Sequence, residues 1–277
     1  MKEPIIVGVD GSHHGLRALK WAAAEAEIHR VPLRLVHASA LLGDDGTVFP
    51  EAALARLRAE RSRRLDEAAA AVLARSPDLD MRTELLAEEP GQALVRAGRD
   101  AALLVVGSRG TGGFDGLLLG SVSLHVAAYA TCPVMVIPQT APDPERASLR
   151  IVVGVDEEHP ADHVLGWAFA EADRRGVPLT ALHAVYTGYG SPRQRIGEEM
   201  ELSEALAGWT AKYPDLPLTR ELPEDKPARA LITASQSAAL LVVGARRRQG
   251  RIGMALGRVN HAVLHHAHCP TVVVPAP

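Results

Sequence analysis

A glycine-rich loop carries the residues whose types and spacing are best suited to chemistry. Between Gly107 and Ser123 the sequence reads GSRGTGGFDGLLLGSVS, with six glycines in 17 residues. Glycines at 107 and 110 remove Cβ atoms, so that backbone N–H groups can approach a polyphosphate closely. Gly120 and Ser121 then open a predicted helix, whose unpaired N–H groups and positive dipole end favour an anion. The hydroxyls of Ser121 and Ser123 add donors, and the loop predicts a phosphate cradle. A flexible surface loop with a routine helix cap is the alternative.

The chain contains the unit that carries this loop twice. The segment IIVGVD ending at Asp10 recurs as IVVGVD ending at Asp156, a shift of 146 residues. The segment LLVVG ending at Gly107 recurs with its end at Gly244, a shift of 137, so the second copy has lost nine residues in between. Two constant shifts predict two homologous domains in tandem. The predicted domains are residues 1–138 and 150–277, joined by a proline-rich polar linker at 139–149.

Each copy alternates strands and helices. Short runs of Val, Ile and Leu, apolar on both faces, are typical of strands in a covered parallel sheet, and the Ala-, Glu- and Arg-rich stretches between them have helical period. The strands expected in the first copy are 4–10, 32–38, 80–86, 102–107 and 133–138, and the helices are 13–29, 51–75, 90–100 and 120–130. This order predicts an α/β fold class: two tandem doubly wound, Rossmann-like domains, each with a five-stranded parallel sheet. Ligands bind such sheets beyond the carboxyl ends of the strands, so the loops after the first and fourth strands should form the site.

Composition excludes several classes of protein. The chain has 277 residues, 47% of them hydrophobic and 4% aromatic, as expected for a protein with one or two ordinary cores rather than a disordered or fibrous chain. A formal net charge of -3 gives no overall basic field for nucleic acid or an anionic membrane. The sequence has two cysteines, no apolar stretch long enough to span a bilayer and no apolar run typical of a signal peptide. We therefore expect a cytoplasmic protein with neither a membrane nor a nucleic acid partner.

The glycine spacing resembles the ATP-binding signature of the universal stress proteins. The motif consists of Gly107, then two residues, Gly110, then nine residues, and finally Gly120-Ser121. It follows the fourth strand of a unit that begins VGVDGS. The resemblance covers both copies from the first strand to the fifth. It implies that the first copy binds ATP, with or without Mg²⁺, and that the chain forms a homodimer. The residues implied to surround the base are Val9, Asp10 and Ala38, and those implied to hold ribose and phosphates are Gly107, Arg109, Gly110, Gly120, Ser121, Val122 and Ser123.

Asp10 also has a physical rationale of its own. A carboxylate at the end of a strand can accept hydrogen bonds from ribose hydroxyls or from an adenine amine. The alternative is a structural role, in which the negative charge stabilises the start of the following helix.

The second copy departs from the motif. Gly244 and Gly257 keep their places, but Arg247 replaces the second glycine and Arg258 replaces the serine. With Arg246, Arg248 and Arg251, five guanidiniums fall within 13 residues. Three interpretations stay open: a dead site, an altered anion site held by guanidiniums, or a solvated basic loop. We expect that the second copy has lost the normal mode of ATP binding.

Two further sets of residues could bind or react. His261 and His265, followed by His266 and His268, could place two imidazoles on one helix face, as a metal site needs. Stabilisation of a helix C-terminus by partly protonated histidine is the simpler explanation, and no metal site is predicted. Cys132 and Cys269 each precede a final strand and are expected to be small buried residues rather than nucleophiles.

The predicted site is suited to binding rather than to catalysis. No Walker lysine follows the glycines, and no carboxylate pair is placed to hold magnesium and to orient an attacking water. No catalytic residue is predicted, and the first hypothesis is an ATP-binding regulatory or stress-response protein with a protein partner that the sequence does not identify. One alternative is a slow ATPase or nucleotide-transferring enzyme in which Arg109 stabilises phosphoryl charge. The other is an interaction module without a nucleotide, in which the repeated domains dock on each other.

Overall fold

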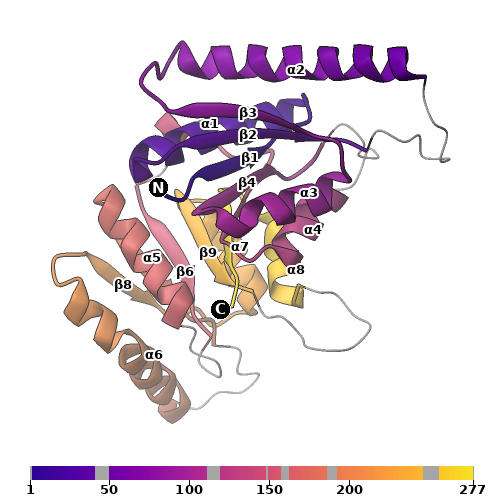
Figure 1. Cartoon of the computed structure of the whole chain (residues 1–277). Coiled ribbons are helices and arrows are strands. Elements are labelled where there is room, and N and C mark those ends of the chain that lie inside the picture. Colours follow the sequence, from indigo (N-terminus) through magenta and orange to yellow (C-terminus); the bar gives the residue numbers. More distant parts are fainter. Residues whose placement is uncertain are drawn as a thin grey trace. The chain divides into compact units, whose positions relative to one another are not determined.

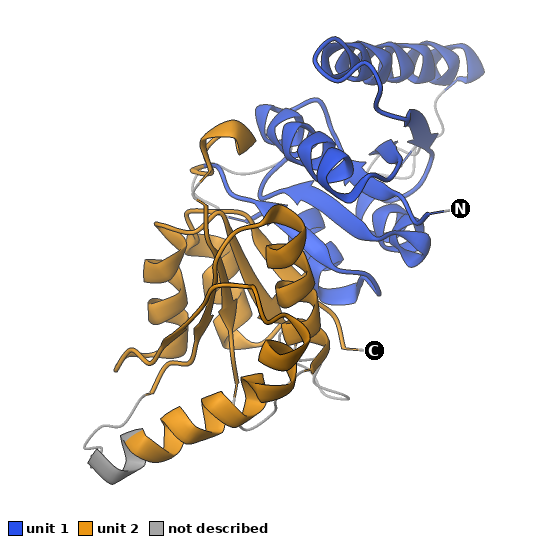
Figure 2. Ribbon diagram, turned by 90° about the vertical axis from the view of Figure 1, so that its left-hand side faces the viewer, with its two compact units in different colours: residues 1–139 blue, residues 140–277 orange. Residues whose placement is uncertain are grey.

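The structure is a computed structural model of the whole chain, which divides into two compact units. Unit 1 is Met1–Gln139 and unit 2 is Thr140–Pro277 (Figure 2). The described residues are 2–40, 50–110, 119–147, 149–156, 162–185, 192–245 and 256–276. The two units are described separately below.

Unit 1 alternates strands and helices along the chain. Its strands are β1 Ile5–Gly8, β2 Leu33–Ala38, β3 Met81–Leu86, β4 Leu103–Gly107 and β5 Val134–Ile137. Its helices are α1 His13–His29, α2 Glu51–Leu73, α3 Pro90–Ala97 and α4 Ser121–Tyr129. A 3₁₀ turn follows α3 at Gly98–Asp100, and a second 3₁₀ turn, Pro144–Arg146, lies at the start of unit 2. Each expected strand and helix is present, and its ends differ from the prediction by three residues at most.

The five strands of unit 1 form one parallel sheet in the order β3-β2-β1-β4-β5. The helices α1 and α2 lie against one face and α3 and α4 against the other, as a doubly wound sheet requires (Figure 1). Every residue of β4 and β5 is buried, because both faces of these strands are covered, whereas the edge strand β3 is partly exposed. The order reverses between β1 and β4, so the loops after these two strands meet at the switch point.

The turn between β1 and α1 is fixed by three consecutive residues. Gly11 adopts a φ of +84°, which residues with a Cβ rarely adopt. Ser12 is the N-cap of α1, and its Oγ accepts a hydrogen bond from Gly15 N at 3.0 Å. This geometry holds Asp10 at the carboxyl end of β1.

One residue of α1 differs from its sequence pattern. Leu16 belongs to the apolar stripe with Leu19, Ala23 and Ala26, but its side chain is 41% exposed, whereas the other three are buried. Leu16 lies at the first turn, where α1 passes the carboxyl edge of the sheet, and it lines the pocket described below.

Unit 2 repeats the architecture. Its strands are β6 Ile151–Gly154, β7 Leu179–Leu182, β8 Leu218–Glu221, β9 Leu240–Gly244 and β10 Thr271–Val274. Its helices are α5 Asp162–Arg175, α6 Pro192–Lys212, α7 Pro227–Ser235 and α8 Arg258–His266. The parallel order β8-β7-β6-β9-β10 is the counterpart of the order in unit 1. Across the described parts of both units, none of the helices combines the length and the apolar character that crossing a bilayer needs.

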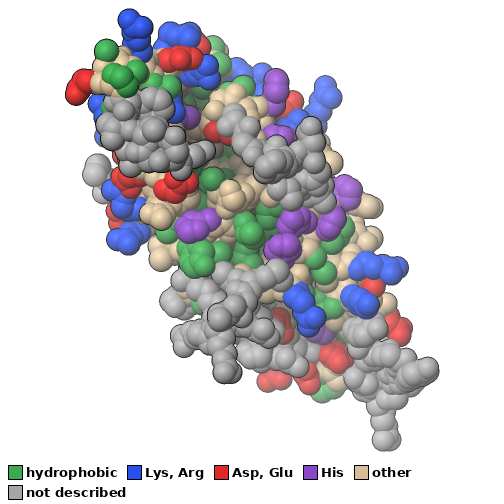
Figure 3. All heavy atoms as spheres, turned by 90° about the vertical axis from the view of Figure 1, so that its right-hand side faces the viewer, with side chains coloured by type: hydrophobic (Ala, Val, Ile, Leu, Met, Phe, Trp, Pro, Cys, Tyr) green, Lys and Arg blue, Asp and Glu red, His purple; other side chains and the backbone are tan. Residues whose placement is uncertain are grey.

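The long helix α2 is a solvated helix. Arg63 pairs with Glu67 and Arg64 pairs with Glu60, each at 2.5 Å and each one helical turn apart. Both basic and acidic side chains are visible at the top of the molecule in Figure 3. Along the face turned to the sheet, Leu65, Ala69 and Val72 are buried.

Candidate functional site

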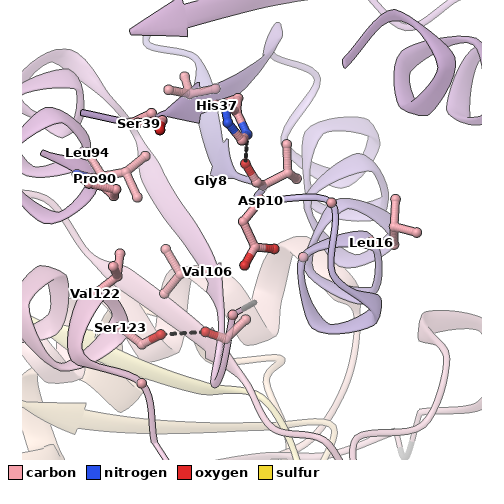
Figure 4. Close-up of a pocket in the computed structure, with 18 of the residues that line it drawn as sticks. Gly8, Asp10, Leu16, His37, Ser39, Pro90, Leu94, Val106, Val122 and Ser123 are labelled. Atoms are coloured by element: carbon pink, nitrogen blue, oxygen red, sulfur yellow. Dashed lines mark hydrogen bonds between the residues drawn. The ribbon is translucent and has the colours of Figure 1, made fainter. Parts of the chain in front are cut away.

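A pocket of about 880 Å³ lies at the carboxyl edge of the sheet of unit 1. Its walls come from the ends of β1, β2 and β4, from α2, and from the start of α4 (Figure 4). The pocket brings together all ten residues that the sequence placed in a site. They are Val9, Asp10, Ala38, Gly107, Arg109, Gly110, Gly120, Ser121, Val122 and Ser123.

Asp10 projects its carboxylate into this pocket (Figure 4). Its Oδ1 accepts a hydrogen bond from Ser12 N at 2.9 Å, which fixes the rotamer of the side chain. A Cβ at Gly110 would lie 2.5 Å from Oδ2, so the carboxylate occupies space that only a glycine leaves open. One oxygen of Asp10 therefore caps the turn before α1, while the side chain also faces the cavity, and its contact with a nucleotide stays a prediction.

The glycines of the loop serve different purposes. A Cβ at Gly107 would lie 2.8 Å from the main-chain oxygen of His14, so packing of β4 against α1 requires this glycine. Gly120 has an ordinary extended backbone, with φ -78° and ψ 155°, and among the described residues a Cβ there would meet nothing closer than 3.5 Å. Protein packing alone would therefore accept a side chain at Gly120, and its absence leaves the space in front of α4 open for a ligand.

The N-terminus of α4 faces this space without a cap of its own. Its N-cap residue, Gly120, has no side chain to accept a hydrogen bond from the first amides, whereas α1 has Ser12 in that role. The N–H of Gly120 donates to Ser108 O at 2.7 Å and ties the helix start to the end of β4. The amides of Ser121 and Val122 follow at the pocket wall, where the helix dipole adds a partial positive charge. An anion is the natural acceptor for them.

Ser123 has a different role from the one expected. Its side chain is buried, and its Oγ donates to Gly107 O at 2.6 Å (Figure 4). Because a hydroxyl has a single hydrogen to donate, Ser123 is not an additional donor for a phosphate in this geometry. It anchors the first turn of α4 to the end of β4, and Ser121, which is exposed, keeps the role of a hydroxyl donor.

The wall of the pocket beside β1 and β4 is apolar. Val9 is buried, and Pro90 and Leu94 of α3 also line the cavity (Figure 4). A Cβ at Gly8 would lie 2.7 Å from Leu94 Cδ1, so this side chain packs directly on the strand end. Such a wall suits the flat face of a base. The sequence did not single out Leu16, Pro90 or Leu94, because apolar residues on helices carry no signal that separates pocket from core.

The pKa values of two histidines next to the pocket are lowered. His37 forms a 2.8 Å hydrogen bond through Nδ1 with Val9 O. Burial lowers the pKa of His37, an effect that this hydrogen bond opposes and that Arg61 reinforces. Burial and the nearby Arg109 guanidinium likewise lower the pKa of His14. The positive charge of Arg109 therefore acts on a side chain next to the pocket.

Unit 2 conserves the frame of this site and changes its lining. Asn260 Nδ2 donates to Gly244 O at 2.7 Å, the counterpart of the bond from Ser123. Gly257 is the N-cap of α8, as Gly120 is of α4, and Arg258 at the first helical position is exposed. The remaining arginines and glycines of this loop, Arg246, Arg247, Arg248, Arg251, Gly250 and Gly253, lie outside the described residues.

The other candidate residues behave as small buried groups or as surface groups. Cys132 and Cys269 are both buried, and burial raises the pKa of their thiols to about 11 and about 12, which makes them poor nucleophiles. The rings of His261 and His265 lie 4.4 Å apart on α8, and histidines are visible on the face of the chain that Figure 3 presents. Within the described residues, no third ligating side chain completes a metal site with this pair.

Comparison with known proteins identifies the fold and the family. A model of the universal stress protein family matches residues 1–138 and 148–275. The chain belongs to the universal stress protein family. The resemblance seen in the glycine spacing is confirmed, because both copies match.

Family members of the same length share the two-unit organisation. Two universal stress proteins of Mycobacterium tuberculosis (strain ATCC 25618 / H37Rv) are 36% and 37% identical over 293 and 287 residues, covering 97% of this chain and 95% and 96% of their own. A universal stress protein of Mycolicibacterium smegmatis is 35% identical over 282 residues, covering 98% of this chain and 96% of its own. The crystal structure of a universal stress protein from Archaeoglobus fulgidus DSM 4304 matches with a TM-score of 0.74 at 18% identity, covering 99% and 96% of the two chains. At this identity the likeness supports the α/β fold alone.

Proposed function

We propose that unit 1 binds ATP in the pocket between β1, β2 and β4, and that the bound nucleotide makes the chain a regulatory, stress-response protein. The observation that carries the proposal is the open space at Gly120, in front of the uncapped N-terminus of α4. Packing leaves this position free to hold a side chain, yet a glycine occupies it and the adjoining amides of Ser121 and Val122 lie at the wall of a pocket. This is the arrangement that a polyphosphate tail needs.

The remaining expected residues fit the rest of the nucleotide. Val9 and Ala38 lie where a base would pack, and the Asp10 carboxylate can accept hydrogen bonds from ribose hydroxyls. Arg109, with Gly107 and Gly110 on either side of it in the loop, brings a positive charge to the phosphates. The pocket volume of about 880 Å³ accommodates a nucleoside triphosphate.

The same set of residues favours binding over turnover. Among the described pocket residues the carboxylates are Asp10 and Glu60, and Glu60 forms an ion pair with Arg64 at 2.5 Å. A pair of carboxylates that could hold Mg²⁺ between them and orient a water is therefore not assembled by this part of the chain. In the alternative of slow ATP hydrolysis, Arg109 would stabilise the phosphoryl charge. A multiple-turnover assay tests this alternative, because ATP turnover that is lost in Arg109→Ala would support it.

Calorimetric titration of the purified full-length chain with ATP tests the proposal. We expect saturable binding with about one nucleotide per chain, because unit 2 has lost the second glycine and the serine of the motif. The absence of binding at millimolar ATP would refute the proposal, and two nucleotides per chain would refute the assigned difference between the units. The homodimer, the cytoplasmic location and the lack of a nucleic acid partner stay predictions, to be tested by light scattering, cell fractionation and gel-shift titration.

A further inference from the structure

Helix α2 contributes one wall of the pocket, and that wall was not predicted. Leu57, Arg61, Leu65 and Ala68 of this helix line the cavity, at spacings of three or four residues that place them on one face. No feature of the sequence separates Arg61 from the other arginines of α2. In the fold, however, this guanidinium is half-buried while those of Arg63 and Arg64 are exposed.

Arg61 carries a buried donor without an acceptor. Its Nη1 is inaccessible to solvent and has no hydrogen-bond partner in the part of the chain that the structure describes. A buried charged group that lacks a partner is costly, and native proteins tolerate such groups mainly where a ligand, ion or water completes them. The guanidinium of the neighbouring Arg64, by contrast, has a partner, because it forms an ion pair with Glu60.

Arg61 lines the same cavity as His37, Val9 and Ala38. His37 follows Val36 near the end of β2 and bonds to Val9 O, and burial together with the charge of Arg61 lowers its pKa. The proposed function assigns the nucleoside to the part of the cavity that Val9 and Ala38 line. The amides of α4 follow the loop after β4, where the phosphates are expected.

Unit 2 provides an internal comparison for this position. The 137-residue offset that relates Gly107 to Gly244 also relates Arg61 to Glu198. His183, the counterpart of His37, bonds through Nδ1 to Val155 O at 3.1 Å, and its Nε2 lies 3.3 Å from Glu198 Oε2. The histidine and its main-chain partner are thus equivalent in both units, but the helix residue has the opposite charge. The carboxylate is paired within the protein in unit 2, whereas Nη1 of the guanidinium in unit 1 has no hydrogen-bond partner among the residues that the structure describes.

We propose that Arg61 contacts the nucleoside end of the nucleotide in unit 1, donating a hydrogen bond to an acceptor atom of the base or ribose, and so sets affinity at that end. The inference rests on the proposed function and adds a residue from α2 that the glycine motif does not contain. It also implies that unit 2, with Glu198 paired to His183, has lost its nucleoside contact as well as its phosphate cradle.

Calorimetric titration of Arg61 variants with ATP and with adenosine tests this role. Arg61→Gln should weaken ATP binding about tenfold and Arg61→Glu, which copies unit 2, about a hundredfold, because a charged hydrogen bond is lost or reversed. The affinity for adenosine, which lacks phosphates, should decrease by the same factor in each variant. Gly120→Leu should weaken ATP binding and leave adenosine binding unchanged. Arg63→Gln is the matched control, because Arg63 lies on the same helix, is exposed outside the pocket and already pairs with Glu67, and this variant should bind ATP as the wild type does.

The outcomes separate the two proposals. If the wild-type chain binds neither ligand, both the proposed function and the role of Arg61 are wrong. If the wild type binds ATP and both Arg61 variants bind it equally well, or if their loss disappears with adenosine, the nucleoside contact is wrong while ATP binding stands. The thermal unfolding of the ligand-free Arg61→Gln variant should match the wild type, since a structural role would lower its melting temperature.

Discussion

Gly120→Leu separates ligand binding from folding. The backbone at Gly120 is extended and a Cβ there would lie 3.5 Å from its nearest described neighbour, so a Cβ at this position causes neither backbone strain nor a clash with the described residues. Replacing an N-cap glycine by an apolar residue should lower the unfolding free energy by about 1 kcal/mol, or about 2–4 °C in melting temperature. The leucine side chain, by contrast, would occupy the space where a phosphate meets the amides of Ser121 and Val122. Losing two hydrogen bonds to a charged group costs about 3–6 kcal/mol, a decrease in ATP affinity of a hundredfold or more.

The repeat supplies the matched control for this prediction. Gly257 is the N-cap of α8, with φ -58° and ψ 159°, so Gly257→Leu places the same change at the equivalent position of unit 2. Calorimetric titration with ATP should show lost affinity for Gly120→Leu and wild-type affinity for Gly257→Leu, with similar small shifts in melting temperature. Equal ATP affinity in both variants would refute the reasoning, because the phosphates would then lie elsewhere.

Three further predictions concern stability and reactivity. Gly107→Ala places a Cβ 2.8 Å from His14 O and should lower the free energy of unfolding in urea by about 1–3 kcal/mol even without ATP, whereas an unchanged curve would show that packing does not require this glycine. His14 and His37 have a pKa below 6.5 when folded, so their contribution to stability is complete above pH 6.5 and is lost as the pH falls through the folded pKa. Urea midpoints should therefore drop between pH 7 and pH 5, and a double His→Gln variant that keeps the full drop would contradict this cause. The thiols of Cys132 and Cys269, with pKa values of about 11 and about 12, should resist a thiol reagent at pH 8 in the native chain and react fully in denaturant, and rapid labelling of the native chain would be the contrary result.

The sequence predicted the fold and the loop because both depend on local patterns. Strands covered on both faces appear as continuous apolar runs, and the repeat doubled the evidence for each of them. The position of Asp10 at the end of β1 and of the glycines after β4 follows from the switch-point rule once the strands are known. All ten expected residues share one pocket for this reason.

The sequence could not predict which side chains tertiary packing turns into that pocket. Arg61 belongs to a helix with many arginines, and its half-buried position depends on how α2 crosses the sheet. Leu16 follows the apolar periodicity of α1, but it lies past the edge of the sheet and lines the cavity. Ser123 has the residue type of a phosphate donor, and only its 2.6 Å bond to Gly107 O reveals that its hydrogen is already used. Each case depends on a contact between segments far apart in the sequence.

A crystal structure of the full-length chain grown with ATP tests the central claim most directly. We predict one nucleotide in unit 1, with phosphate oxygens at about 2.7–3.2 Å from the amide nitrogens of Ser121 and Val122 in front of Gly120. A pocket that stays empty at millimolar ATP, or a nucleotide whose phosphates avoid the start of α4, would contradict the account.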